Sequence, residues 1–186
     1  ELGGAVLKEP EDIPGTGRFA VLSDPQGAVF CAYTSASESP AQGEPKLGEF
    51  SWHELATTDL DGAWAFYQEL FGWEKLQAMD MGPELGVYMI FGMGSRQMGG
   101  MYVKPASMPA PPNWLPYAMV ADVKKAAATA TGRGATILNG PMQVPAGSWI
   151  AVAMDPQGAA FAIHSMTVGG GKAPAKKPAK KKAAKK

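Results

Sequence analysis

The chain offers few side chains that could act as a nucleophile or bind a transition metal. It contains one cysteine, Cys31, and two histidines, His53 and His164. One cysteine cannot form a disulfide within the chain, and these three residues cannot supply the closed ligand set of a structural zinc site. A protein-bound metal would therefore need carboxylate ligands.

Glu54 is the carboxylate whose surroundings best suit a catalytic or ligand-binding role. Its segment reads as extended, and alternate side chains of a strand share a face, so Glu54 lies with Trp52 and Ala56 while His53 lies on the other face. A carboxylate in a concave apolar site has its pKa raised by burial and can act as a general base or receive a cation. The structural alternative is an ion pair with Arg96 or hydrogen bonds to backbone donors.

Charge is distributed unevenly along the 186 residues. The formal net charge is zero, but Lys172 to Lys186 hold eight of the 17 basic side chains and no acid. Residues 1–171 are therefore acidic, and the cationic tail is expected to be disordered and to contact nucleic acid without sequence specificity. A solubilising tail, or one that neutralises the acidic domain, is the alternative. No apolar run is long enough to cross a bilayer and no signal pattern is present, which predicts a cytoplasmic protein without membrane contact.

The chain contains an internal repeat. Residues 3–33 match residues 134–164 at a constant offset of 131, with 12 of 31 positions identical. Each copy contains an Asp-Pro-Gln-Gly turn between two apolar runs, which predicts a hairpin. A period as long as a domain indicates tandem domains. We expect four parts: the last three strands of a truncated upstream domain, a linker, a complete domain and a tail, at residues 1–36, 37–48, 49–166 and 167–186.

The complete domain reads as the same order of elements twice. Asp59 can cap a helix whose apolar residues recur at helical spacing until Gly72, and Asp122 can cap a second helix. One strand-like run precedes each helix and three follow it. The pattern predicts an α+β domain made of two βαβββ units.

Several motifs carry a resemblance to a known family. Residues 59–67 (Asp-Leu-Asp-Gly-Ala-Trp-Ala-Phe-Tyr), 70–73 (Leu-Phe-Gly-Trp) and the closing turn at 155–158 resemble the glyoxalase, bleomycin-resistance and extradiol-dioxygenase superfamily, also called vicinal oxygen chelate proteins. Residues 54–59, 99–101 and 114–117 resemble a two-domain subgroup described only as glyoxalase-like. The resemblance implies that the paired units form an eight-stranded cup, which in the family's enzymes grips a divalent metal through four side chains, usually His and Glu.

The resemblance also implies where those metal ligands would stand. Carried over, the positions fall on Trp52, on one of Gly99, Gly100 and Met101, on Pro116 and on Ala162, and none of these side chains binds a metal. The two glycines are expected to permit a bend or the close approach of a ligand. We therefore expect a cup without metal or cofactor, with Glu54 as the candidate catalytic residue and the ligand bound by Trp52, Glu54, Met101, Pro116, Ala162 and His164.

Three functions follow from these expectations. The first is a glyoxalase-like protein that binds a small molecule in its cup. The second is an enzyme of the same superfamily, a lyase, dioxygenase or isomerase, that works through a metal whose ligands are misregistered or through Glu54 as base. The third is a nucleic-acid-associated protein that binds through Lys172 to Lys186. The sequence leaves open whether cups form within one chain or across a dimer.

Overall fold

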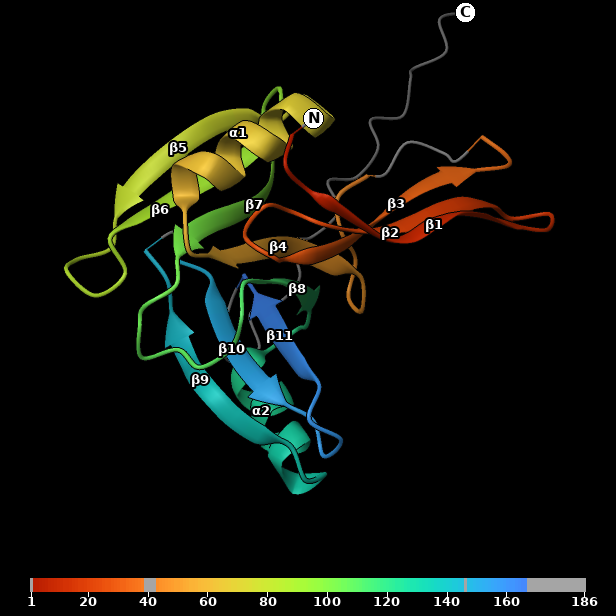
Figure 1. Cartoon of the computed structure of the whole chain (residues 1–186). Helices are drawn as coiled ribbons and strands as arrows, with labels where there is room; N and C mark the ends of the chain where they lie inside the picture. The colour runs from red at the N-terminus through yellow and green to blue at the C-terminus, as the bar shows by residue number, and fades with distance from the viewer. Residues whose placement is uncertain (1, 39–42, 146, 167–186) are drawn as a thin grey trace, which may run out of the picture.

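The fold is of the expected α+β class. The computed structural model describes residues 2–38, 43–145 and 147–166, and these residues form eleven strands and two helices. Figure 1 shows a small sheet of three strands beside a larger sheet of eight strands, with one helix against each half of the larger sheet. The larger sheet carries the candidate site.

The first βαβββ unit begins at residue 50. Its elements are β4 (Phe50–Thr57), α1 (Leu60–Phe71), β5 (Glu74–Asp80), β6 (Val87–Met93) and β7 (Arg96–Val103). Helix α1 starts where Asp59 accepts a hydrogen bond from the Gly62 backbone N–H at 3.0 Å. It ends at Gly72, whose φ of 66° is the left-handed conformation that favours glycine. The sequence predicted both helix ends.

The second unit repeats this order. Its elements are β8 (Asn113–Met119), α2 (Val123–Gly132), β9 (Thr136–Gln143), β10 (Trp149–Met154) and β11 (Ala160–Ser165). Asp122 caps α2 by accepting from the Lys125 backbone N–H at 3.2 Å. The two predicted units are therefore present in the structure.

The two units join along their first strands. The strand order is β5-β6-β7-β4-β8-β11-β10-β9, and β4 pairs antiparallel with β8 at the centre. One face of this sheet packs against the helices: Leu55, Met89 and Met101 lie in the core beside α1, and Ala151 and Ile163 lie beside α2. We call the opposite side the helix-free face. It corresponds to the inside of the expected cup.

The three N-terminal strands form a separate sheet that packs on α1. Its strands are β1 (Ala5–Ile13), β2 (Gly17–Ser23) and β3 (Val29–Ser35), in the order β1-β2-β3. Strands β2 and β3 pair with the same register as β10 and β11 do 131 residues later, for example Ala20 with Ala32 and Ala151 with Ile163. Equal registers place equivalent residues on equivalent faces of the two hairpins.

The closing turn of the first hairpin is buried against α1. Asp24 is 2% exposed and accepts a hydrogen bond from the Tyr67 hydroxyl at 3.0 Å, and Tyr67 in turn accepts one from the Trp114 indole N–H at 2.8 Å. The Phe30 ring packs edge-on against Phe66 and Tyr67. These contacts tie the small sheet to both α1 and β8.

Some predictions concern segments outside this description. Within the described residues, neither helix is both long and apolar enough to span a membrane. Part of the predicted linker, residues 39–42, and the predicted tail, residues 167–186, lie outside the described residues. The tail's role and the location of the protein therefore stay predictions.

Candidate functional site

Glu54 stands on the central strand β4 of the helix-free face. Its neighbour Leu55 is fully buried in the core beside α1, so alternation turns Glu54 to the other side. The Tyr88 hydroxyl donates to Glu54 Oε2 and the Tyr117 hydroxyl donates to Glu54 Oε1, each at 2.9 Å. Two tyrosines from different strands, β6 and β8, therefore hold the carboxylate in place.

Trp52 determines the direction of the hydrogen bond between Tyr88 and Glu54. Its indole Nε1 donates to the Tyr88 hydroxyl oxygen at 2.9 Å. An indole N–H is a donor without an acceptor role, so the Tyr88 oxygen must accept from Trp52 and its own proton is free to point at Glu54. Trp52 thus orients Tyr88 as a donor to the carboxylate.

Gly100 makes this arrangement sterically possible. It lies on β7 between Glu54 on β4 and Ile90 on β6. A Cβ at this position would overlap Cζ and the hydroxyl oxygen of Tyr88. The Tyr88 ring therefore crosses β7 over the bare backbone of Gly100 to reach Glu54. The close approach expected at these glycines is made by a side chain of the protein.

Burial governs the electrostatics of the site. It raises the pKa of Glu54 above its usual 4.5, and the hydrogen bonds from Tyr117 and Tyr88 oppose that rise. Burial and the nearby Glu54 charge raise the pKa values of Tyr88, Tyr102 and Tyr117, so all three phenols are protonated at neutral pH. Glu54 is thus a half-buried carboxyl among protonated donors.

The structure brings together four of the predicted site residues. Trp52 and Glu54 lie side by side as expected. Ala162 is registered beside Tyr117 on the same face, because the next residue, Ile163, packs beside α2. His164 lies on this face too, further along β11, and its Nδ1 is 3.0 Å from the Ser51 hydroxyl oxygen. Burial lowers the pKa of His164.

Met101 and Pro116 are placed elsewhere. Met101 is fully buried in the core beside α1 and is paired with Leu55, so it does not line the helix-free face. Pro116 is paired with His53 on the helix side of the sheet. The adjacent residues, Gly100 and Tyr117, take the positions expected for them. On β8 the position opposite Trp52 is Tyr117, one residue beyond Pro116, and a difference of one residue turns a side chain to the other face of the sheet.

The sequence analysis did not identify Tyr88 and Tyr117 as site residues. One signal in the sequence could have found them: each tyrosine stands among apolar residues of a strand, and a phenol buried there normally finds a hydrogen-bond partner. Glu54 is that partner for both.

The donor set of this face does not fit the metal that the resemblance implies. Among the described residues, no three His, Cys, Asp or Glu side chains lie close enough together to hold a metal ion. Around Glu54 this face presents Trp52, Gly100, Tyr117 (in place of the carried-over Pro116) and Ala162, and both carboxylate oxygens already accept hydrogen bonds. A divalent metal needs several oxygen or nitrogen ligands at once.

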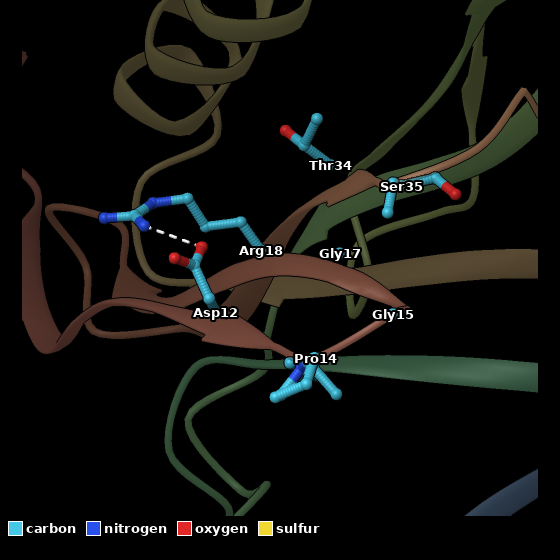
Figure 2. A pocket seen from close by; sticks show the side chains of 9 residues that line it. Asp12, Pro14, Gly15, Gly17, Arg18, Thr34 and Ser35 are labelled. Carbon is cyan, nitrogen blue, oxygen red and sulfur yellow. Dashed lines mark hydrogen bonds and ion pairs between the residues drawn. The ribbon is translucent and has the colours of Figure 1, made fainter.

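Two hollows on the described surface lie away from Glu54. One, of about 340 Å³, is at the tip of the small sheet, where Figure 2 shows Arg18 paired with Asp12 beside Pro14 and Gly15. Both side chains of this pair are exposed, and Arg18 Nη1 lies 2.7 Å from Asp12 Oδ1, so the two charges of the hollow are already paired with each other. The other, of about 500 Å³, lies at the N-terminal end of α1. Both are open to solvent, and neither gathers buried polar groups as Glu54 does.

Comparison with known proteins agrees with the fold. The chain is 32% identical over 162 residues to "Putative glyoxylase CFP32" of Mycobacterium tuberculosis, covering 87% of this chain and 60% of that protein. It is 28% identical over 167 residues to "Anthracycline biosynthesis protein DnrV" of Streptomyces peucetius, covering 90% of this chain and 59% of that protein. The chain therefore spans about 60% of the length of these curated relatives.

A solved structure shows the same architecture. The Mn(II)-bound glyoxalase from Novosphingobium aromaticivorans matches with a TM-score of 0.59 and 19% identity, over 88% of this chain and 55% of that chain. The model of the Glyoxalase/Bleomycin resistance protein/Dioxygenase superfamily matches residues 49–163, the range that holds both βαβββ units. The chain belongs to this superfamily.

Proposed function

We propose that the protein binds a small organic molecule on the helix-free face, around Glu54, and that it does so without the family's metal. The main support for this proposal is the half-buried Glu54 carboxylate, which Tyr88 and Tyr117 hold in place next to the ring of Trp52. Ligand sites combine apolar and aromatic walls with a few precisely placed polar groups. A carboxylate has room for about four hydrogen bonds, and the two tyrosines use two, so acceptor positions remain for a ligand.

A compound screen tests this binding function. Hits found by thermal shift would be titrated against the protein and against Trp52→Ala, Glu54→Gln and the control Glu69→Gln, which removes an exposed carboxylate on α1. We expect the first two variants to weaken binding about tenfold or more and the control to leave it unchanged. Hits that bind both site variants as tightly as the wild type would place the ligand elsewhere.

A second function, proton transfer, is favoured by the raised pKa of Glu54. A carboxyl whose pKa is raised toward neutrality is a better general base than an exposed one. If Glu54 takes a proton from carbon in a bound ligand, that position should exchange with deuterium in D₂O. NMR would follow the exchange, and exchange that persists in Glu54→Gln would exclude Glu54 as the base.

The nucleic-acid proposal rests on charge alone. Eight lysines between Lys172 and Lys186 can contact phosphates, and each contact would make the slope of log affinity against log salt more negative by about 0.9. Duplex DNA of any sequence should then bind at about 50 mM salt and lose affinity steeply as salt rises. Deleting residues 172–186 should abolish this binding. No measurable affinity of the full chain would leave the solubilising role.

A further inference from the structure

The hydrogen bonds around Glu54 are arranged for an anion. Tyr88 and Tyr117 both donate to the carboxylate, one to each oxygen, and Trp52 prevents Tyr88 from reversing its role. If Glu54 were protonated, its O–H would face one of the two hydroxyls, and Tyr117, whose role Trp52 does not fix, would have to turn from donor to acceptor. The donors therefore match the ionised form of Glu54, in a place where burial makes that form costly.

The strand positions registered beside Glu54 hold no cationic side chain. The positions registered next to Glu54 hold Gly100 on β7 and Leu115 on β8, and the neighbouring pair on the same face is Trp52 with Tyr117. None of these side chains is cationic. Residues 49–166 contain ten acidic and six basic side chains, so the field of the domain also favours cations.

Aromatic side chains surround the carboxylate. Trp52, Tyr88 and Tyr117 reach it or each other through hydrogen bonds, and the Tyr102 ring stacks on Tyr88 with centroids 6.0 Å apart. Ring faces attract cations, and the attraction increases where water is displaced. A metal ion would need further ligands that this face lacks, whereas an ammonium group needs one counter-charge and aromatic contact.

We propose that the helix-free face selects organic cations, meaning protonated amines or quaternary ammonium groups, over neutral molecules of the same shape. This inference rests on the binding function proposed above and adds the chemical class of the ligand. Glu54 supplies the counter-charge, and the four aromatic residues supply the walls.

Choline and its neutral carbon isostere dimethylbutanol test the proposal, with benzyltrimethylammonium as a larger permanent cation. NMR or calorimetric titration of the full chain should show choline binding about tenfold tighter than dimethylbutanol. Glu54→Gln should reduce that ratio to about one, and Glu69→Gln should leave it unchanged. Tyr117→Phe removes a donor but no charge, so it should keep a preference for the cation. In the wild type, raising salt from about 50 to 500 mM should lower the ratio.

The outcomes separate the two proposals. Equal affinity for choline and dimethylbutanol in the wild type, with binding that depends on Trp52, would overturn cation selectivity and retain the binding site. The same holds if neither probe binds but neutral library hits do so in a Trp52-dependent way. Hits insensitive to both Trp52→Ala and Glu54→Gln would overturn both proposals. The ratio of choline affinity to dimethylbutanol affinity is measured on the wild type, so the proposal can be refuted even if Glu54→Gln fails to fold.

Discussion

Replacing Gly100 with alanine should break the hydrogen bonds around Glu54 although none of the residues that form them is substituted. The new Cβ would overlap the far end of the Tyr88 ring, and that ring can swing away only by leaving Glu54 and Trp52. Losing a hydrogen bond to a charged group costs about 1.5–3 kcal/mol, and losing the bond to the indole costs about 1 kcal/mol. Replacing a glycine in a strand returns about 0.5–1 kcal/mol. We expect a net loss of about 2 kcal/mol.

Chemical and thermal unfolding would measure this loss. For a chain of this size, about 2 kcal/mol corresponds to a Tm lower by about 4–8 °C. Gly132→Ala is the matched control, because a Cβ there meets nothing within 4 Å and the residue is in the last turn of α2. That control should be neutral or slightly stabilising.

A double-mutant cycle would identify the cause. In a Tyr88→Ala background the ring that clashes is gone, so Gly100→Ala should cost nothing or stabilise the strand. If Gly100→Ala costs the same about 2 kcal/mol in both backgrounds, the glycine is needed for its backbone and the reasoning about Tyr88 is refuted.

Three further predictions concern the contact between the two sheets, the pKa of Glu54 and metal binding. Tyr67→Phe leaves Asp24 Oδ2 and the Trp114 indole N–H without their partner, so it should lower the free energy of unfolding by about 1–3 kcal/mol. The control Tyr33→Phe, at an exposed tyrosine, should cost less, and equal losses in urea unfolding would contradict the prediction. Because the folded protein binds the Glu54 proton more tightly than the unfolded chain does, wild-type stability should fall relative to Glu54→Gln as pH rises above about 4.5, and parallel stability–pH curves would exclude the raised pKa. Thermal melts with and without EDTA should coincide, since the donor set around Glu54 does not fit a metal; a drop of several degrees that Mn, Ni or Zn reverses would show that a metal binds after all.

The helices and the face of Glu54 could be predicted because they depend on local rules. Asp59 and Gly72 fix the ends of α1 through a cap and a left-handed residue, and strand alternation alone places Glu54 opposite Leu55. The common turn sequence also predicts hairpins, and the two hairpins share their register.

The partners of Glu54 could not be predicted because they depend on register between distant strands. Counting back from the Asp122 cap pointed to Pro116, but the pairing of β8 with β4 puts Tyr117 opposite Trp52, and a difference of one residue moves a side chain to the other face. Tyr88 reaches Glu54 only across a strand between them, and only because Gly100 leaves the path open. Neither the register between two strands nor the open path over Gly100 is visible in the sequence of one strand.

The one-way polarity of the Trp52 hydrogen bond limits how protons can travel. An indole nitrogen gives its hydrogen bond but has no lone pair to receive a proton, so the line from Glu54 through Tyr88 ends at Trp52. It holds a donor in place and cannot serve as a relay to solvent. In the proton-transfer function proposed above, a proton taken up by Glu54 would therefore not leave by way of Trp52.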